Sequence, residues 1–161
     1  MFREMRRNKQ QLPAEVCTEI LYQGSCGVLA LAGDDGYPYA VPLSYVFDGE
    51  KIFFHCATEG HKLDAIRRCD KASFCVIAQD KVVPEKFTTY YRSVIAFGRV
   101  RILQDKQEIL DSIEKLAIKY TPDDEAGRRK EIDESLDHLC MLQMTIEHLS
   151  GKQARELMQQ D

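Results

Sequence analysis

The sequence lacks the features by which proteins that bind nucleic acids or membranes are recognised. Its 22 lysines and arginines are outnumbered by 26 aspartates and glutamates, which leaves a net charge of -4 and no basic excess, so we expect no nucleic-acid partner. The longest uncharged stretch, residues 20–33, contains glycines and is too short to span a bilayer. No apolar segment follows the basic N-terminus, so we expect a soluble, cytoplasmic protein with no membrane partner.

Common cysteine and nucleotide-binding motifs are absent as well. The six cysteines form no C-x-x-C pair and lie mostly in apolar runs, which predicts reduced, buried thiols and argues against a zinc cluster or a disulfide framework. Neither G-x-G-x-x-G nor a G-x-x-x-x-G-K-[ST] loop is present, so a phosphate site cannot be assigned to either of those nucleotide-binding folds. His55 and His61 have no third ligand at a useful spacing, and we expect no metal site.

The most informative stretch that is present runs from residue 52 to residue 68. Its apolar first part predicts a buried strand, residues 52–57, and a turn then leads into a helix that begins near His61 and Lys62. A helix start carries unpaired backbone N–H groups and the positive end of the helix dipole, so the neighbouring lysine predicts a phosphate site. His55 lies within the strand, where a lone histidine is either a hydrogen-bonded core residue or a ligand contact.

The rest of the chain has the patterns of short strands joined by turns. Pro38 and Pro42 fall in one strand and mark an edge, a bulge or a place where a ligand meets the backbone, and Gly98 predicts a bend or bulge in another. The length fits a single domain, residues 1–161, with a mainly β (α+β) fold and a small barrel. We predict strands at 26–33, 37–47, 52–57, 71–79, 90–103 and 140–149, helices at 13–23, 61–68, 106–120 and 123–138, a loop at 80–89, and a polar tail from about residue 152.

Three segments together resemble one family. They are DGYPYAVPLSYVFDGEKIFFHCATEGHKLDAIRR, YRSVIAFGRV and HLSGKQ, and they combine the patterns G-x-P-x-x-x-P, F-H-x-A-x-x-G-x-K and Y-x-S-V. In this combination the chain is similar to the split barrels that bind flavin mononucleotide (FMN) and are related to pyridoxamine 5′-phosphate oxidase, in the branch named for nitroimidazole resistance. The resemblance extends from about Met5 to Lys152.

The resemblance implies a six-stranded split β-barrel with a few flanking helices. It also implies a homodimer with two FMN sites at the subunit interface, to which the partner subunit contributes part of the Y-x-S-V strand. The cofactor-binding residues that it implies, with His61 and Lys62 as the phosphate clamp, are Val41, Pro42, Leu43, Ser44, His55, Cys56, Ala57, His61, Lys62, Tyr91, Ser93, Val94 and Lys152. The long arginine-rich C-terminal segment with which the oxidase holds its substrate is missing, which argues against vitamin B6 oxidation.

We therefore expect an FMN-dependent oxidoreductase that passes electrons from a reduced nicotinamide or another donor to a small organic acceptor, with a nitroaromatic such as a 5-nitroimidazole as one candidate. The flavin carries the redox chemistry in such proteins, so no catalytic side chain is expected. The alternative is a non-catalytic carrier or sensor that binds flavin, heme or deazaflavin, in which His55 or His61 is an axial iron ligand. A third interpretation is an interaction protein that keeps the fold and has lost the cofactor.

Overall fold

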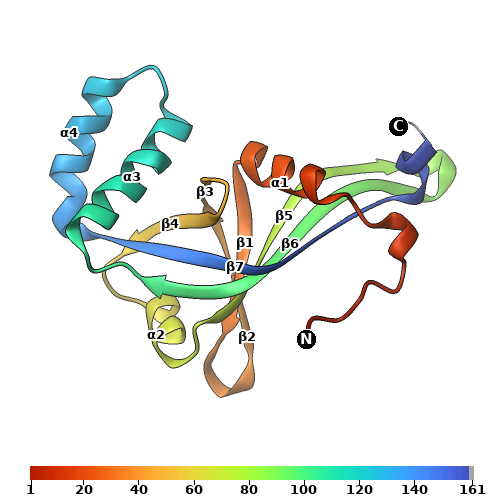
Figure 1. Ribbon diagram of the computed structural model, residues 1–161, viewed down its shortest axis with the longest axis horizontal. Coiled ribbons are helices and arrows are strands. Elements are labelled where there is room, and N and C mark those ends of the chain that lie inside the picture. The colour runs from red at the N-terminus through yellow and green to blue at the C-terminus, as the bar shows by residue number, and fades with distance from the viewer. Residues whose placement is uncertain (160–161) are drawn as a thin grey trace.

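Seven antiparallel strands and four helices make up the computed structural model, which describes residues 1–159 (Figure 1). The strands form one sheet in the order β2-β1-β5-β6-β7-β4-β3. They are β1 (Cys26–Ala32), β2 (Pro38–Ser44), β3 (Val46–Phe47), β4 (Lys51–Ala57), β5 (Lys71–Val83), β6 (Thr88–Ile102) and β7 (Leu139–Gln153). The helices are α1 (Ala14–Gln23), α2 (His61–Arg68), α3 (Lys106–Tyr120) and α4 (Glu125–Ser135).

The two ends of the sheet belong to one continuous segment, which closes the sheet into a barrel. β2 pairs with β1, and β3 pairs with β4. Only Tyr45 separates the end of β2 from the start of β3. Tyr45 is fully buried, and its hydroxyl donates a hydrogen bond to the carbonyl of Leu21 at 2.8 Å. β2 and β4 touch, yet they are not hydrogen-bonded neighbours in the sheet order. We call the opening between them the split.

The predicted mainly β class and the split barrel are confirmed, with seven strands in place of the predicted six. The difference arises in residues 37–47, which we predicted as one strand. Tyr45 breaks this strand because its ring is buried against Phe74 and its backbone N–H donates to the hydroxyl of Tyr120 at 3.1 Å. The predicted edge position of Pro38 and Pro42 is also confirmed, since β2 pairs with β1 alone in the sheet order.

Alternating side chains of β4 supply two separate hydrophobic cores. Ile52 and Phe54 point into the barrel and join a core to which β1, β5, β6 and β7 contribute. Phe53 points the other way, into a smaller core beneath α3 that contains Leu116 and Met141. Because a fully buried side chain of this size contributes about 1.5–3 kcal/mol, the smaller core is enough to hold α3 against the outside of the barrel.

Some sequence predictions are wrong in their boundaries. Residues 80–89, predicted as a loop, extend both β5 and β6, because their β-branched residues continue the ladder on either side of a short turn at Pro84–Lys86. The predicted polar tail begins later than residue 152, since β7 runs to Gln153 and the following Ala154 and Leu157 are buried. Residues 160–161 of that tail lie outside the described residues. The bulge predicted at Gly98 is confirmed by a register shift at that point.

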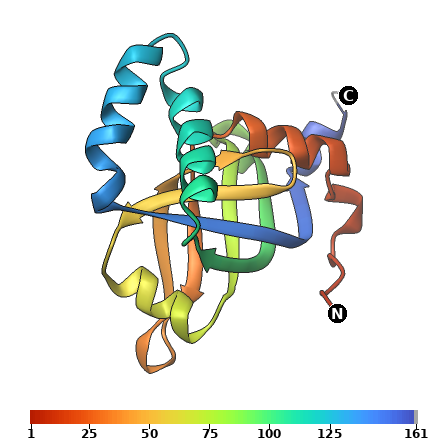
Figure 2. The ribbon, with the colours of Figure 1, turned by 60° about the vertical axis from the view of Figure 1, so that its left-hand side comes forward.

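The helices lie at opposite ends of the barrel (Figures 1 and 2). α2 and the turn between β1 and β2 lie together at one end, and the hairpin of α3 and α4 lies at the other. β2 runs from the first end to the second, so it connects two regions of different character. No helix in the described part of the chain is long and apolar enough to cross a membrane.

Candidate functional site

β2 forms one side of the split and presents alternating side chains to it. Val41 and Leu43 are half-buried and pack against the barrel core, whereas Pro42 and Ser44 are exposed on the other face of the strand. From Tyr39 near α2 to Ser44 near α3 the strand covers about 17 Å, at roughly 3.4 Å per residue. This is comparable to the length of an extended mononucleotide, so a ligand of that size can lie along the strand.

The end of the split beside α2 is charged, and we call it the charged end. His61 stacks on Tyr39, with ring centroids 4.2 Å apart. Asp34, from the turn between β1 and β2, lies within ion-pair distance of two side chains: His61 Nε2 lies 3.3 Å from one carboxylate oxygen, and a guanidinium nitrogen of Arg68 lies 2.5 Å from the other. These contacts fix the imidazole of His61 over β2.

The start of α2 has the properties of an anion site. Gly60 precedes the helix with φ 132°, a conformation that favours glycine, and its carbonyl accepts from the N–H groups of Leu63 and Asp64. The N–H groups of His61 and Lys62 make none of the hydrogen bonds described for residues 1–159. Lys62 is half-buried and has no carboxylate within ion-pair distance in the same range. Two free N–H groups, a helix dipole and an unpaired cation together fit a phosphate.

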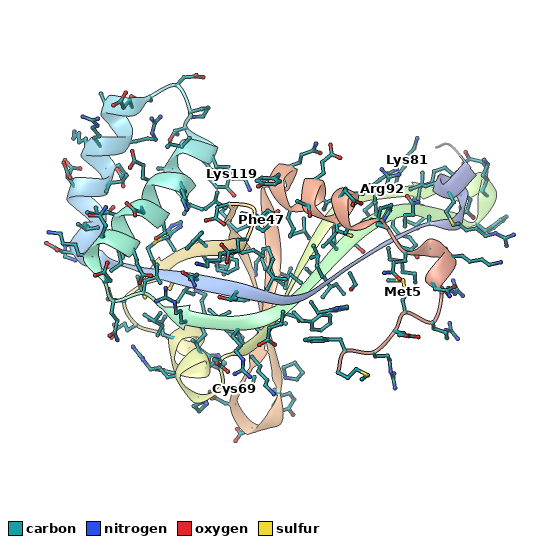
Figure 3. All side chains as sticks on the ribbon, viewed as in Figure 1. Met5, Phe47, Cys69, Lys81, Arg92 and Lys119 are labelled. Carbon is teal, nitrogen blue, oxygen red and sulfur yellow. The ribbon has the colours of Figure 1, made fainter. Side chains whose placement is uncertain are left out.

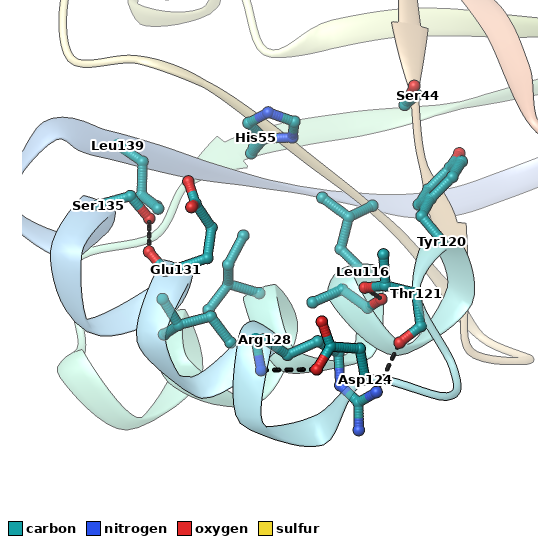
Figure 4. A pocket seen from close by; sticks show the side chains of 14 residues that line it. Ser44, His55, Leu116, Tyr120, Thr121, Asp124, Arg128, Glu131, Ser135 and Leu139 are labelled. Carbon is teal, nitrogen blue, oxygen red and sulfur yellow. Dashed lines mark hydrogen bonds between the residues drawn. The ribbon is translucent and has the colours of Figure 1, made fainter.

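The other end of the split opens into a cavity of about 530 Å³ that α3 and α4 cover (Figure 4). We call it the helix-covered pocket. Two barrel residues that the sequence assigned to the cofactor, Ser44 and His55, line its barrel side. The helices and the start of β7 supply the remaining lining: Ile113, Leu116, Ala117, Tyr120, Thr121, Asp124, Gly127, Arg128, Glu131, Ile132, Ser135 and Leu139.

His55 points into this pocket with an unpartnered imidazole. The alternation of β4 puts its side chain on the face opposite to Cys56, toward α3 and α4 (Figure 4). The imidazole is exposed and takes part in none of the side-chain hydrogen bonds described for the chain, so the interpretation of His55 as a hydrogen-bonded core residue is wrong. A pocket with an apolar lining and a few free polar groups such as this imidazole is typical of a small-molecule site.

The end of α3 is anchored to the barrel beside the pocket. Lys119 Nζ donates to the carbonyls of Gly24 and Tyr45 at 2.5 and 2.8 Å, and burial lowers the pKa of its ammonium group. The hydroxyl of Tyr120 donates to the carbonyl of Ser25. The sequence analysis missed this contribution of α3 to the site. The helical spacing of its apolar residues was the available signal, but it marks a face that packs without showing what it encloses.

The end of β4, with Cys56 and Ala57, lies close in sequence to Lys62 at the start of α2. Cys56 is half-buried and faces the barrel, Ala57 is exposed at the end of the strand, and Lys62 lies close enough to Cys56 to lower the pKa of its thiol against the larger, opposing effect of burial. The prediction that the cysteines are mostly buried is wrong. Only Cys17 is buried, because the other five lie on strand faces or helix ends that solvent reaches.

The remaining predicted residues lie away from the split. Ser93 on β6 is opposite Lys152 on β7, and the Lys152 ammonium lies 5.7 Å from the ring centre of Tyr91. Arg92, labelled in Figure 3, belongs to the same strand as Tyr91 and Ser93, whereas Cys69, which directly follows α2, lies well apart from it in this view. Val94 is fully buried in the barrel core. One chain therefore does not bring the two parts of the predicted site together.

The described residues contain no group of three or more histidine, cysteine, aspartate or glutamate side chains arranged to hold a metal ion.

Comparison with known families identifies the class of protein. The family model described as pyridoxamine 5′-phosphate oxidase matches residues 13–153, nearly the whole chain. The chain belongs to this family. No curated protein sequence matches it.

Solved structures of similar fold come from several bacteria. A conserved hypothetical protein of Mycobacterium tuberculosis has a TM-score of 0.80 at 19% identity, with 96% of this chain and 92% of that chain covered. A candidate 5-nitroimidazole antibiotic resistance protein of Bacteroides thetaiotaomicron has a TM-score of 0.75 at 18% identity, covering 88% and 85%. A protein of Mycobacterium smegmatis that binds FAD and heme has a TM-score of 0.74 at 23% identity, covering 91% and 74%. At these identities the likeness extends to the fold.

Proposed function

We propose that this protein is a cytoplasmic flavin-dependent oxidoreductase that binds FMN along β2 and reduces a small organic acceptor. The observation that carries the proposal is the layout of the split: the start of α2, with the N–H groups of His61 and Lys62 unbonded within residues 1–159, lies at one end, and an apolar pocket with an unpartnered imidazole lies at the other. Membership of the pyridoxamine 5′-phosphate oxidase family supports a flavin. The unpaired cysteines fit a reducing compartment.

The residues along the split fit FMN in chemical type. The N–H groups at the start of α2, with Lys62 and His61, would hold the phosphate. Pro42 and Ser44, on the exposed face of β2, would pack against a flat ring, while Val41 and Leu43 support the strand from the barrel core. The end of β4 from His55 to Ala57 would lie on the opposite side of the ring. When bound, the flavin supplies hydride or single-electron transfer, and the protein supplies binding, orientation and exclusion of water.

We place the acceptor in the helix-covered pocket. A planar aromatic acceptor fits its apolar floor of Ile113, Leu116 and Leu139, and a polar substituent such as a nitro group would face polar lining residues such as Thr121 and Ser135. A 5-nitroimidazole has both features. The fold shared with the candidate nitroimidazole resistance protein of Bacteroides thetaiotaomicron makes this substrate class the first one to test.

Reconstitution tests the cofactor and the activity in sequence. The purified chain is expected to bind FMN with a dissociation constant in the micromolar range or below and to give a two-banded flavin spectrum. With a reduced nicotinamide as donor, the loaded protein is expected to reduce 5-nitroimidazoles or quinones faster than free FMN does. A colourless protein that does not take up FMN would contradict the proposal.

We further propose that the active form is a homodimer in which the partner completes each site. Tyr91, Ser93 and Lys152 lie around Arg92 on the β6–β7 ladder, and Figure 3 shows Arg92 far from Cys69 at the end of α2, so a second copy would supply these residues to the split. The outer face of the sheet offers the contact surface: Val28, Ile77 and Ile95 are 37%, 64% and 37% exposed on neighbouring strands. A row of exposed apolar residues on one sheet face is typical of an interface.

Mixed dimers test the shared site directly. Lys62→Ala and Tyr91→Ala are each expected to weaken FMN binding when present alone. In a mixed dimer of the two variants, one site carries both substitutions and the other carries neither, so half of the sites are expected to regain tight binding. Mixing two Lys62→Ala preparations is the control and restores nothing. A monomer in sedimentation experiments, or no recovery in the mixed dimer, would contradict the shared site.

A second candidate function is binding of heme or deazaflavin without turnover. The observation that favours heme is the free imidazole of His55, because an unpartnered histidine in an apolar pocket is a potential axial iron ligand. The protein of Mycobacterium smegmatis with this fold binds both FAD and heme. A Soret band on titration with hemin that is lost in His55→Ala would support this candidate, and its absence would remove it.

A further inference from the structure

Two of the six cysteines face each other across the ladder between β4 and β7. Cys56 pairs in register with Cys140, one residue from the end of β4 and one residue from the start of β7. Directly opposed residues of an antiparallel ladder point to the same face and have Cα atoms about 4.5–5.5 Å apart. A disulfide requires a Cα separation of about 4.4–6.8 Å, so the backbone already has the spacing of a disulfide.

No other pair of cysteines in the described part of the chain is opposed in register. Cys26 is opposite Ser44, and Cys75 is opposite Val28 and Ile95. Cys69 follows the last residue of α2 and belongs to no strand. The opposed arrangement is therefore specific to Cys56 and Cys140.

Charged neighbours distinguish the two thiols. Burial raises the pKa of both and brings that of Cys56 to about 11. The positive charges of Arg67 and Lys62 lower the pKa of Cys140 against this effect. Of these two charges only Lys62 acts on Cys56, where burial outweighs it. Cys140 is thus the thiol that loses its proton more readily, and the thiolate is the nucleophilic form.

We propose that Cys56 and Cys140 form a reversible dithiol–disulfide pair that small hydroperoxides oxidise. The Cys140 thiolate attacks the peroxide oxygen, breaks the O–O bond and becomes a sulfenic acid, while the leaving oxygen takes a proton and departs as an alcohol, or as water from hydrogen peroxide. The Cys56 sulfur then attacks the Cys140 sulfur, which forms the S–S bond and releases water. Two thiols and one hydroperoxide thus give one disulfide, one alcohol and one water, and a small dithiol reverses the reaction.

Peptide mapping of the full chain tests this inference. Protein that has been reduced and desalted is treated with hydrogen peroxide, alkylated, and digested with trypsin without reduction. Residues 52–62 and 131–152 are tryptic peptides with one cysteine each, so a link between them identifies the pair. The expected product is the two joined peptides with the mass of their sum less two hydrogens, and dithiothreitol is expected to remove it. Both peptides alkylated, while exposed Cys26 is oxidised, would overturn the inference.

Matched serine variants separate this pair from the other thiols. Cys140→Ser is expected to abolish the linked peptide and to leave Cys56 open to alkylation. Cys69→Ser, which removes another half-exposed thiol, is expected to keep it. A link from Cys56 to Cys69 in the unmodified chain would overturn the inference, and the mapping of that chain decides the question even where a variant fails to fold. The pair needs no cofactor, so this result stands apart from the proposed function.

Discussion

At the charged end of the split, exposed side chains hold one another through an ion pair and a ring stack, whereas at the helix-covered end the lining residues also belong to a hydrophobic core. His61, Arg68 and Asp34 contact each other on the surface beside α2. Ile113 and Leu116 line the pocket and at the same time fasten α3 to the barrel. Residues at the charged end can thus bind a ligand without contributing to the hydrophobic core, whereas residues at the helix-covered end both line the pocket and stabilise the fold.

This difference makes the two ends separable by substitution. Changes at the charged end are expected to weaken anion binding without unfolding the protein, because surface ion pairs contribute little to stability. Changes in the floor of the pocket are expected to destabilise the fold. The expected effects below run from the largest to the smallest.

Leu116→Ala is expected to give the largest loss of stability. Leu116 is 4% exposed and belongs to the core beneath α3, so its truncation leaves a cavity and costs about 2–5 kcal/mol. Ile118 lies on the same helix and is 44% exposed, so Ile118→Ala is the matched control, with an expected change of about 0.5 kcal/mol or less. Urea denaturation of both variants measures the difference, and equal midpoints would contradict the dual role of the pocket floor.

Lys62→Ala is expected to weaken FMN binding by about 1.5–3 kcal/mol, or roughly 10- to 150-fold, through loss of a charged hydrogen bond to the phosphate. The unfolding free energy of the cofactor-free protein is expected to stay the same, since Lys62 has no carboxylate partner within residues 1–159. Calorimetric titration with FMN measures the effect. Lys130→Ala, on the exposed face of α4, removes the same charge elsewhere and is expected to leave FMN affinity unchanged.

Asp48→Asn is expected to lower stability by about 1 kcal/mol at pH 7, which is below the range of about 1.5–3 kcal/mol for charged hydrogen bonds because Lys115 is half exposed. Burial alone raises the pKa of Asp48, but hydrogen bonds from Lys115 at 2.7 Å and from the N–H groups of Lys51 and Glu50 outweigh it and hold the pKa below its ordinary value.

The pH dependence of this variant follows from the sign of that shift. Because the pKa of Asp48 is lower in the folded protein, its stabilisation is complete above the unfolded value of about 4 and is lost as pH falls through the folded value. Denaturation of both proteins from pH 7 to pH 3 is expected to show converging stabilities. A constant difference across this range would show that Asp48 does not tie α3 to the barrel through its charge.

The sequence predicted the local features of the site better than the pocket that α3 and α4 enclose. The turn before α2 and the helix start at His61 depend on neighbouring residues and were predicted correctly. The start of α3 is equally local, since the Asp105 carboxylate accepts from the N–H groups of Gln107 and Glu108. The pocket was missed because it forms between segments far apart in the chain. The break at Tyr45 was missed for the same reason, since its partners at Leu21 and Tyr120 come from two different helices.

Local patterns also failed to predict the lengths of β5 and β6. Residues 80–89 have the polar composition of a loop, yet Val82 and Val83 pair with Thr89 and Thr88 and continue the ladder. Pairing between two segments adds hydrogen bonds that no single segment reveals, and this outweighs polar composition. The hairpin is therefore longer than predicted and carries exposed apolar residues such as Phe87 at its tip.

His55→Ala is expected to give the smallest effect and to separate the two ends most clearly. Loss of one neutral hydrogen bond to a ring atom is expected to weaken FMN binding by roughly 0.5–1 kcal/mol. Because α3, α4 and the start of β7 line the pocket around His55 and no residue of α2 does, the same loss is expected for riboflavin, which has no phosphate. Lys62→Ala, by contrast, is expected to weaken FMN and to leave riboflavin unchanged. Parallel titrations of both variants with both ligands measure this, and a His55→Ala defect confined to FMN would place the imidazole at the phosphate and remove the distinction between the two ends.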